Sequence, residues 1–528
     1  MDKAQEAGPA KLLTPVRIWA FGFLLIFSVH ISWESANNLP PSWDMAHHQL
    51  IGLQMADALA SGNLWEGYAG LSNYYPPLYY LNEALVIHLM GDSPILPLLS
   101  NLLGLLLLSY FTFRAGELFL PQPAAVSAGL IILTLPMIAW TSRVSLLDTG
   151  LAGWVILAFY LLLKSDRFEN RKLTLMFGAA AALGMLHKWT FPFFLFLPVI
   201  VSLAASKSKK KSLLNILLAG SIAMVLSATW YWPNAGELLE RFRSTAEAGT
   251  EFERDPGLAS IWGWVYYIRC LASYYLFLPL TLLLAASLFR LRKRIIQDYA
   301  LLLIGAGLLG SLVSMTMLDM KDPRYIMPAA PFAVLLLIAG WINRPAVSLI
   351  LIPAWCFLQL ILVSFSVPGI PEKIAFFEVE NDASYKSMNY ELVLFETSYF
   401  DILGKARDEY WRLEEILGYF QNGEKVAVIP EHPYFNTTTL ALLAYRKGLS
   451  GIEFSRVGME PFERGQFSGA DWAIGKSGDQ GVDFLTLFNR EAYKKLRDNQ
   501  WPIEAILSLP DGSRARIWDL SAAVQAGD

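Results

Sequence analysis

Apolar stretches about as long as a membrane-crossing helix alternate with short polar segments through the first 367 residues of the chain. A helix needs roughly 20 apolar residues, within a range of about 17–25, to cross the hydrocarbon core of a bilayer. By this rule the sequence predicts eleven spans, at about 16–33, 94–113, 124–140, 147–163, 173–187, 190–205, 213–232, 264–289, 297–318, 326–342 and 346–366. The first apolar run lacks a clear small-residue cleavage site, so we read it as an uncleaved span.

Lysine and arginine gather in the segments that join particular pairs of these spans. Clusters occupy 164–172, 207–211 and 290–294, and Lys11, Arg17, Arg114 and Arg344 fall on the same side. Short loops rich in Lys and Arg stay on the cytoplasmic side of a membrane. We therefore expect a cytoplasmic N-terminus and, because the number of spans is odd, a C-terminus outside.

The segment 34–93, between the first two spans, has the opposite charge. From Glu34 to Pro94 there is no Lys or Arg. Six acids lie in this stretch: Glu34, Asp44, Asp57, Glu66, Glu83 and Asp92. We expect a large acidic loop on the outer face.

After about residue 368 the pattern changes to shorter alternations of polar and apolar residues. The runs 425–430 (KVAVIP) and 471–475 (DWAIG) predict short buried strands. Residues 406–420 predict a helix, because Tyr410, Leu413, Leu417 and Phe420 recur at helical spacing. The sequence therefore predicts two domains, a transmembrane domain at 1–367 and an extracytoplasmic α/β domain at 368–528.

Composition supports a membrane protein. Of 528 residues 54% are hydrophobic and 17% charged, with a mean hydropathy of +0.39, whereas a soluble domain carries about 25% charged residues. The two cysteines, Cys270 and Cys356, lie in apolar runs, so we expect no disulfide framework. Phosphate-binding glycine loops and zinc-ligand spacings are absent from the sequence, so nothing indicates a nucleotide, and a nucleic-acid partner is not expected.

Apart from the basic clusters of the inner loops, the unusual ionisable residues near predicted spans lie at the outer ends rather than at mid-span. They are Asp44, Arg143, Asp148, His187, Lys188 and the run 319–324. A secondary transporter usually keeps its ionisable site near the bilayer midplane. An enzyme that acts on a lipid headgroup needs its charges at the water interface, and this distribution favours the enzyme.

Five motifs, in order along the chain, carry a resemblance to a known family. They are 40–44 (PPSWD), 73–80 (NYYPPLYY), 142–150 (SRVSLLDTG), 184–192 (GMLHKWTFP) and 321–328 (KDPRYIMP). Over about residues 16–345 the chain resembles the GT-C membrane glycosyltransferases, in the group of the protein O-mannosyltransferases and the lipid A aminoarabinose transferase. The resemblance implies a multi-pass enzyme of a prokaryotic inner membrane that moves a sugar from a polyprenyl-phosphate carrier to an acceptor on the outer face. It also implies that an acid of the first outer loop, by position Asp44, lies near the reaction.

Residue chemistry suggests how such a site would work. Asp44 would act as general base on the acceptor hydroxyl, and Asp148 is the second candidate catalytic residue. Lys188 and Arg324 would bind the donor phosphate, a leaving group that needs cations rather than an acid. A single displacement would invert the anomeric centre. Candidate substrate-binding residues are His47, His48, Tyr74, Tyr75, Tyr79, His187 and Tyr325.

Each of these residues also has a purely structural interpretation. Asp44 could cap a helix at 45–59, and Asp148 could pair with Arg143 or cap the fourth span. Lys188 could reach the interface from a helix end. Arg324 could be an ordinary flank of a span. The histidines and tyrosines could form an aromatic and polar belt at the membrane surface.

The metal and the substrates stay open at this stage. In the aminoarabinose-transferase pattern an acid and a base precede the Pro-Pro pair, where this chain has Tyr74 and Tyr75, with Glu83 following instead. We therefore predict no metal site and leave a loosely bound divalent ion open. The sugar, a hexose or a pentose, is not specified, nor is the acceptor, which could be a protein, a glycolipid or a polysaccharide. A lipid-headgroup flippase and a non-catalytic membrane-anchored binding protein are the alternative functions.

Overall fold

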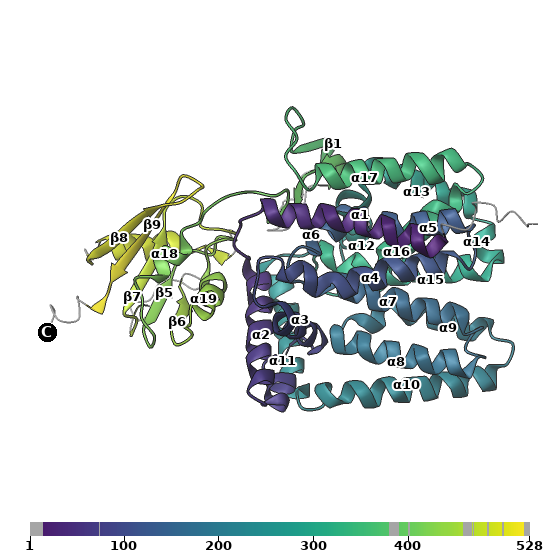
Figure 1. The fold of residues 1–528 in the computed structure, drawn as a ribbon, viewed down its shortest axis with the longest axis horizontal. Coiled ribbons are helices and arrows are strands. Elements are labelled where there is room, and N and C mark those ends of the chain that lie inside the picture. The colour runs from purple at the N-terminus through teal and green to yellow at the C-terminus, as the bar shows by residue number, and fades with distance from the viewer. Residues whose placement is uncertain are drawn as a thin grey trace, which may run out of the picture.

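The computed structural model describes residues 14–72, 74–379, 390–399, 402–457, 467, 469–482, 485–498 and 501–521. A large helical body carries a smaller domain, which contains a β-sheet, at one end (Figure 1). The N-terminal helix begins at the end of the body away from that domain (Figure 1).

The helical body consists of long helices and of shorter helices that continue one another. Their bounds are α1 (Pro15–Ala36), α4 (Leu96–Gly116), α5 (Gln122–Ile131), α6 (Pro136–Thr141), α7 (Asp148–Lys164), α8 (Arg171–His187), α9 (Phe191–Ala205), α10 (Lys209–Tyr231), α12 (Ile261–Cys270), α13 (Phe277–Leu291), α14 (Arg294–Gln297), α15 (Tyr299–Thr316), α16 (Ala330–Gly340) and α17 (Ile352–Leu362). Every predicted span overlaps one of these helices or a continuous helical run. Within the described residues, 6 helices are long and apolar enough to cross a membrane. The total of eleven spans stays a prediction.

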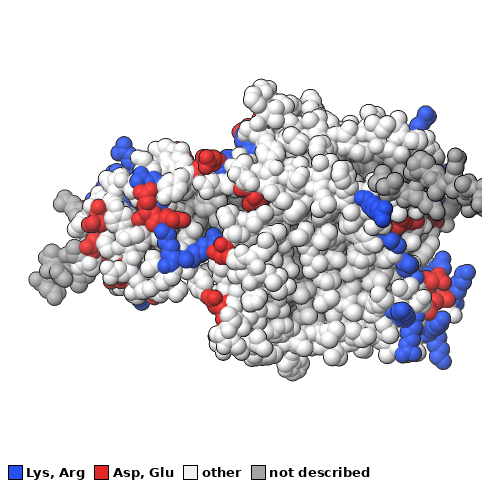
Figure 2. All heavy atoms as spheres, viewed as in Figure 1, with Lys and Arg blue, Asp and Glu red and all other residues white. Residues whose placement is uncertain are grey.

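The surface of the body is that of a multi-pass membrane protein. Phe21, Leu24 and Met224 expose 64–71% of their surface, which an aqueous environment would disfavour and lipid accommodates. In Figure 2 the middle of the body is almost free of charge, whereas Lys and Arg gather at the end away from the smaller domain, where α8 and α10 begin.

Close packing of α4, α7 and α8 fixes the N-terminal end of α7. A Cβ added to Gly104 of α4 would lie 2.8 Å from the Cα of Gly150 in α7, and one added to Gly150 would lie 2.3 Å from the His187 ring. Small residues let helices in a membrane approach this closely. Asp148, the first residue of α7, is thereby held beside the end of α8.

Two further helices, α2 (Trp43–Ala60) and α3 (Leu78–Met90), fill the predicted outer loop. Between them lies the short turn η1 (Glu66–Gly70). On the same side of the body lies α11 (Ala235–Glu247) (Figure 1). It is followed by η3 (Ala248–Phe252), which contacts α11, and η5 (Pro323–Ala329) contacts α7. In Figure 1, α2 stands at the boundary between the helical body and the smaller domain.

The C-terminal domain contains a five-stranded sheet in the order β6-β5-β7-β9-β8. The strands are β5 (Lys425–Val428), β6 (Glu453–Arg456), β7 (Trp472–Lys476), β8 (Ile503–Ser508) and β9 (Arg514–Asp519). β5 is parallel to β6 and β7, and β9 is antiparallel to both its neighbours. α18 (Leu413–Leu417) and α19 (Thr437–Arg446) share one apolar core with the sheet, and α20 (Asn489–Asp498) shares another. The two predicted strands and the α/β class are confirmed.

In the described part of the segment before this sheet, four short strands form. They are β1 (Lys373–Val379), β2 (Tyr390–Glu396), β3 (Ser398–Tyr399) and β4 (Leu403–Gly404). β1 pairs with β2, and β3 with β4, both antiparallel.

The predicted helix at 406–420 is wrong over most of its length, since only α18 forms. Backbone groups of the segment bond elsewhere: Ala406 N–H donates to the Ser364 carbonyl at 2.9 Å, and the Arg407 carbonyl accepts from Asn38 N–H at 2.8 Å. Arg412 has a left-handed φ of 56°, which breaks helical continuity. Tertiary hydrogen bonds have replaced the helical ones.

The C-terminal domain rests directly on the outer loop. Leu442 of α19 packs against Ala46 and Leu53 of α2. Arg446 holds Asp92 with two hydrogen bonds of 2.7 Å, a bidentate geometry that also fixes orientation. The domain is therefore attached to the loop that carries Asp44.

Candidate active site

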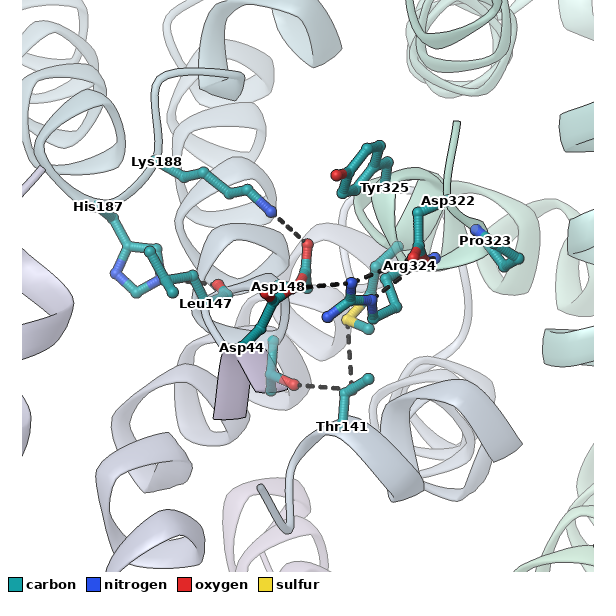
Figure 3. A network of polar contacts seen from close by, with 12 residues as sticks. Asp44, Thr141, Leu147, Asp148, His187, Lys188, Asp322, Pro323, Arg324 and Tyr325 are labelled. Carbon is teal, nitrogen blue, oxygen red and sulfur yellow. Dashed lines mark hydrogen bonds and ion pairs between the residues drawn. The ribbon is translucent and has the colours of Figure 1, made fainter. Parts of the chain in front are cut away.

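Four charged side chains from distant parts of the sequence meet near the N-terminal end of α7 (Figure 3). Asp44 comes from the first turn of α2, Asp148 from the start of α7, Lys188 from the residue after α8 and Arg324 from η5. They line one small polar pocket together with His48, Tyr75, Leu146, Leu147 and Tyr325. The structure thus brings together all four charged residues selected from the sequence.

Asp148 and Lys188 form a buried ion pair. Lys188 Nζ donates to Asp148 Oδ1 at 2.7 Å, and the side chains are only 3% and 5% exposed. The alternative pairing of Asp148 with Arg143 is not observed. The Arg143 guanidinium donates instead to His30 Nδ1, at 3.0 Å, and to Ser364. Lys188 does not reach outward to the membrane surface, because its side chain turns into the pocket.

Arg324 is shared by two acids. Its guanidinium donates to both carboxylate oxygens of Asp322 at 3.1 Å and lies 3.4 Å from Asp44 Oδ2. Asp322 Oδ1 also accepts from the Arg324 backbone N–H at 2.8 Å. Asp322 thus binds both the backbone N–H and the guanidinium of Arg324. These contacts hold the guanidinium in the site rather than extended into solvent.

Asp44 is the most accessible of the four charges, with 63% of its side chain exposed. It is not the cap of α2: Ser42 occupies that position, and Asp44 lies within the first turn. A carboxylate there is favoured by the helix dipole. The predicted capping role is therefore wrong, and the carboxylate lies beside Arg324 in the pocket.

Aromatic rings surround the ammonium group of Lys188. The Tyr325 and Tyr75 ring centroids lie 5.1 and 5.7 Å from its Nζ, within range of a cation–π attraction. Tyr74 packs on Tyr75 with ring centroids 4.4 Å apart. Burial raises the pKa of Tyr75 well above its usual value, so its phenol stays protonated and can donate a hydrogen bond.

The two histidines of α2 differ in their surroundings. His48 lines the pocket and shares a 2.8 Å hydrogen bond with the Tyr80 hydroxyl through Nδ1. Burial, and then the charges of His47, Lys188 and Arg324, hold the pKa of His48 well below its usual range, so this ring is neutral at neutral pH. Burial also lowers the pKa of His47; Asp44 opposes this effect, and Arg241 adds to it.

Arg241, on α11, is a residue that the sequence analysis missed. Its charge acts to lower the pKa of both His47 and Tyr74, after the larger effect of burial, so it lies near these two residues. Arg241 is a basic residue in a predicted outer segment, where Lys and Arg are otherwise disfavoured. This exception to the charge bias could have marked it as a candidate site residue.

His187 and Tyr79 lie behind the pocket rather than in its lining. His187 Nε2 bonds to the Leu147 carbonyl at 2.8 Å, and the Tyr79 ring packs edge-on against His187 with centroids 5.9 Å apart. Their contact with a substrate stays a prediction, as it does for His47 and Tyr74.

No cluster of three or more His, Cys, Asp or Glu with the geometry to hold a metal ion is found among the described residues. Glu83 is fully buried and accepts from Ser145 Oγ at 2.7 Å. Burial raises the pKa of Glu83 to about 8. Lys321, in the run 319–324, directs its ammonium to the Thr316 carbonyl at 2.9 Å rather than into the pocket.

Comparison with known proteins identifies the fold. No protein-family model matches the sequence, and no curated protein sequence matches it. Among solved structures, ArnT from Cupriavidus metallidurans bound to undecaprenyl phosphate has a TM-score of 0.50 and 17% identity, covering 67% of this chain and 66% of that one. The apo form of the same protein gives a TM-score of 0.48, 19% identity and coverage of 68% and 67%. An Archaeoglobus fulgidus oligosaccharyltransferase tethered with an acceptor peptide gives 0.49, 8% identity and coverage of 94% and 74%.

The likeness to the undecaprenyl-phosphate complex of ArnT confirms the GT-C type of fold that the motifs predicted. The match spans about two thirds of that protein's chain. At this identity the likeness concerns the fold alone, and the chemistry has to be argued from the site.

Proposed function

We propose that this protein is an inverting glycosyltransferase that moves a sugar from a polyprenyl-phosphate donor to an acceptor on the outer face of the membrane. The observation that carries the proposal is the convergence of Asp44, Asp148, Lys188 and Arg324 on one polar pocket. Four charges from four segments, placed at one end of an apolar body, suit a substrate with a lipid tail and a charged headgroup.

The two cations would bind the donor phosphate. As the bond between the anomeric carbon and the phosphate oxygen breaks, negative charge grows on the phosphate, and fixed cations in a water-poor site stabilise it. Arg324 is suited to a bidentate grip on phosphate oxygens, and Lys188 to a point contact. Asp148 would hold Lys188 in place, since its carboxylate lies 2.7 Å from the ammonium.

Asp44 would be the general base, because it is the exposed acid of the pocket. The acceptor hydroxyl transfers its proton to the Asp44 carboxylate while its oxygen attacks the anomeric carbon. The electron pair of the breaking bond leaves with the polyprenyl phosphate. Attack from the side opposite the leaving group inverts the anomeric centre, and a positioned base contributes about 10²–10⁴-fold to the rate.

The same proposal includes a site on the outer face of a prokaryotic inner membrane, with a cytoplasmic N-terminus and the C-terminal domain, residues 368–528, outside. The basic end of the body, opposite the C-terminal domain in Figure 2, supports this orientation. The polyprenyl donor is supported by the ArnT structure, which was solved with undecaprenyl phosphate.

The decisive experiment incubates the purified protein with a panel of polyprenyl-phosphate hexoses and pentoses, together with candidate protein, glycolipid and polysaccharide acceptors. Release of polyprenyl phosphate with the sugar recovered on an acceptor supports the proposal. Movement of the intact lipid across vesicles without release would instead indicate a flippase. Binding without either event would indicate a non-catalytic binding protein.

A further inference from the structure

The segment 37–43, which joins α1 to α2 and leads into Asp44, is held by the C-terminal domain. Arg407 N–H donates to Asn37 Oδ1 at 3.2 Å, and Asn38 N–H donates to the Arg407 carbonyl at 2.8 Å. Thr439 Oγ1 donates to the Pro41 carbonyl at 2.9 Å. The position of the segment 37–43, which leads to Asp44, is thus fixed by contacts from outside the helical body.

Trp43, the residue directly before Asp44, also contacts the C-terminal domain. Its φ is 31°, in a region that bulky L-residues rarely adopt and that persists only where surrounding structure imposes it. Its indole N–H donates to Glu431 Oε2 of the C-terminal domain at 3.2 Å. This hydrogen bond ties the Trp43 side chain to the C-terminal domain at the point where the backbone turns into α2.

Glu431 is itself firmly held. Only 3% of it is exposed, and it follows β5 at the end of the sheet. Its second carboxylate oxygen pairs with Arg456 Nε of β6 at 3.0 Å, and its backbone N–H donates to the Gln480 carbonyl at 2.9 Å. Because Glu431 is held by the sheet, the position of the sheet determines where Glu431 can hold the indole of Trp43.

We infer that Glu431 is a positioning residue for Asp44, acting through the indole of Trp43. The inference rests on the proposed function, in which Asp44 accepts the proton of the acceptor. It gives the C-terminal domain a part in the reaction, because a shift of about 1 Å in a reacting group can cost up to about 10²-fold in rate. Asp44 is open to such a shift, since its side chain is 63% exposed and the Arg324 guanidinium that pairs with it lies 3.4 Å away.

The first test is Trp43→Phe, which keeps an aromatic ring but removes the indole N–H and leaves the Glu431–Arg456 pair intact. We expect kcat to fall about 10-fold or more, with the KM for the donor within about two-fold because neither cation of the pocket is touched. The matched control is Trp33→Phe. It removes another indole hydrogen bond between the two parts of the chain, Trp33 Nε1 to the Gly404 carbonyl at 2.9 Å, and should leave kcat near the wild-type value.

Two further variants separate positioning from simple folding. Glu431→Ala should match Trp43→Phe, whereas Glu431→Gln, which keeps an acceptor oxygen, should recover much of the lost kcat. In an Asp44→Asn background, Trp43→Phe should cause no further loss, because both changes act on the same group. A further loss as large as in the wild-type background would overturn the inference.

Hydrogen exchange of the backbone amides of residues 44–48 tests the contact without any assay of transfer. These amides should exchange faster in Trp43→Phe and Glu431→Ala than in the wild type and in Trp33→Phe. If the wild type transfers no sugar but this difference is present, the proposed function fails and the positioning contact stands. If transfer and exchange are both unchanged in Trp43→Phe, the positioning role is excluded.

Discussion

The carboxylate of Asp148 lies 2.7 Å from the ammonium of Lys188, and both side chains are almost completely removed from solvent. A buried ion pair contributes little net stability, yet breaking it by removing one partner is strongly destabilising. The pair can therefore serve to position Lys188, because the Asp148 carboxylate holds the ammonium inside the pocket, where a phosphate would bind under the proposed function.

Asp148→Asn should lower stability by about 3–5 kcal/mol, because it leaves the Lys188 charge buried without a partner. Asp148→Asn combined with Lys188→Met should recover most of that loss, since replacing both partners of a buried pair is often nearly neutral. Melting temperature measures the recovery. The double variant should nevertheless bind polyprenyl phosphate more weakly than the wild type, because the ammonium is gone. Binding equal to that of the wild type would show that Lys188 does not contact the phosphate.

Arg324→Ala should weaken binding of polyprenyl phosphate by about 10-fold or more, because a hydrogen bond to a charged group is worth about 1.5–3 kcal/mol. Arg324→Lys should restore only part of the affinity, since the planar fork is lost. Arg114→Ala is the control: Arg114 also pairs with an acid, Glu117 at 3.0 Å, near the end of α4 away from the site. Isothermal titration should show equal affinities for Arg114→Ala and the wild type.

The sequence predicted the helical body and the four central charges for physical reasons. Apolar runs long enough to cross a bilayer leave few alternatives to helices. Charged side chains are costly in the hydrocarbon core, so those near the spans gather at the span ends. Asp148 and Lys188 are far apart in the sequence, but both follow from the rule that outer span ends meet at one face. That rule identifies which residues come together but not which of them form ion pairs. The sequence therefore left the pairing of Asp148 with Arg143 equally open.

The errors arose where contacts between distant segments decide the outcome. Local spacing predicted a helix at 406–420. Backbone groups of that segment instead form hydrogen bonds with Asn38 and Ser364. Nothing near Glu431 in the sequence indicates that it meets Trp43, since the two positions belong to different domains. Arg241 lies in an outer segment whose position over the site depends on tertiary packing.

Topology can be tested with alkaline phosphatase, which is active only outside the cytoplasm. A fusion after Ser366, which follows α17, should be active, and so should one at Asn63 in the outer loop. A fusion at Lys210, in the basic first turn of α10, should be inactive. The reverse pattern would overturn the orientation and the outer-face site with it.

His432 should make stability depend on pH. Burial and the Lys476 charge lower its pKa to about 4 against the opposing charges of Asp479 and Asp511, whereas an unfolded chain has a histidine pKa of about 6.5. As pH falls below about 6.5 the unfolded chain takes up a proton that the folded protein refuses, so stability falls until about pH 4. The full shift corresponds to about 3 kcal/mol.

The measurement is the melting temperature of the full chain at several pH values between 7.5 and 4.5. His432→Asn keeps an acceptor for the Tyr434 N–H, which now bonds to His432 Nδ1 at 3.3 Å. It should make the pH dependence less steep, with the buried His48 contributing to the slope that remains. His88→Asn, at an exposed position on α3, should leave the slope as in the wild type. Equal slopes in all three proteins would contradict the assignment to His432.

Asp44→Asn isolates the proton acceptor, because Asn has the shape of Asp and its side-chain oxygen can still accept from Arg324. The side chain is 63% exposed and does not cap α2, so neither folding nor donor binding should depend strongly on its charge. We expect an unchanged melting temperature, donor affinity within a few-fold, and sugar transfer reduced by about 10²-fold or more. Glu66→Gln, an exposed acid of the same outer loop, should transfer sugar at the wild-type rate. Transfer by Asp44→Asn within a few-fold of that rate, at equal stability and donor binding, would show that another group takes the proton.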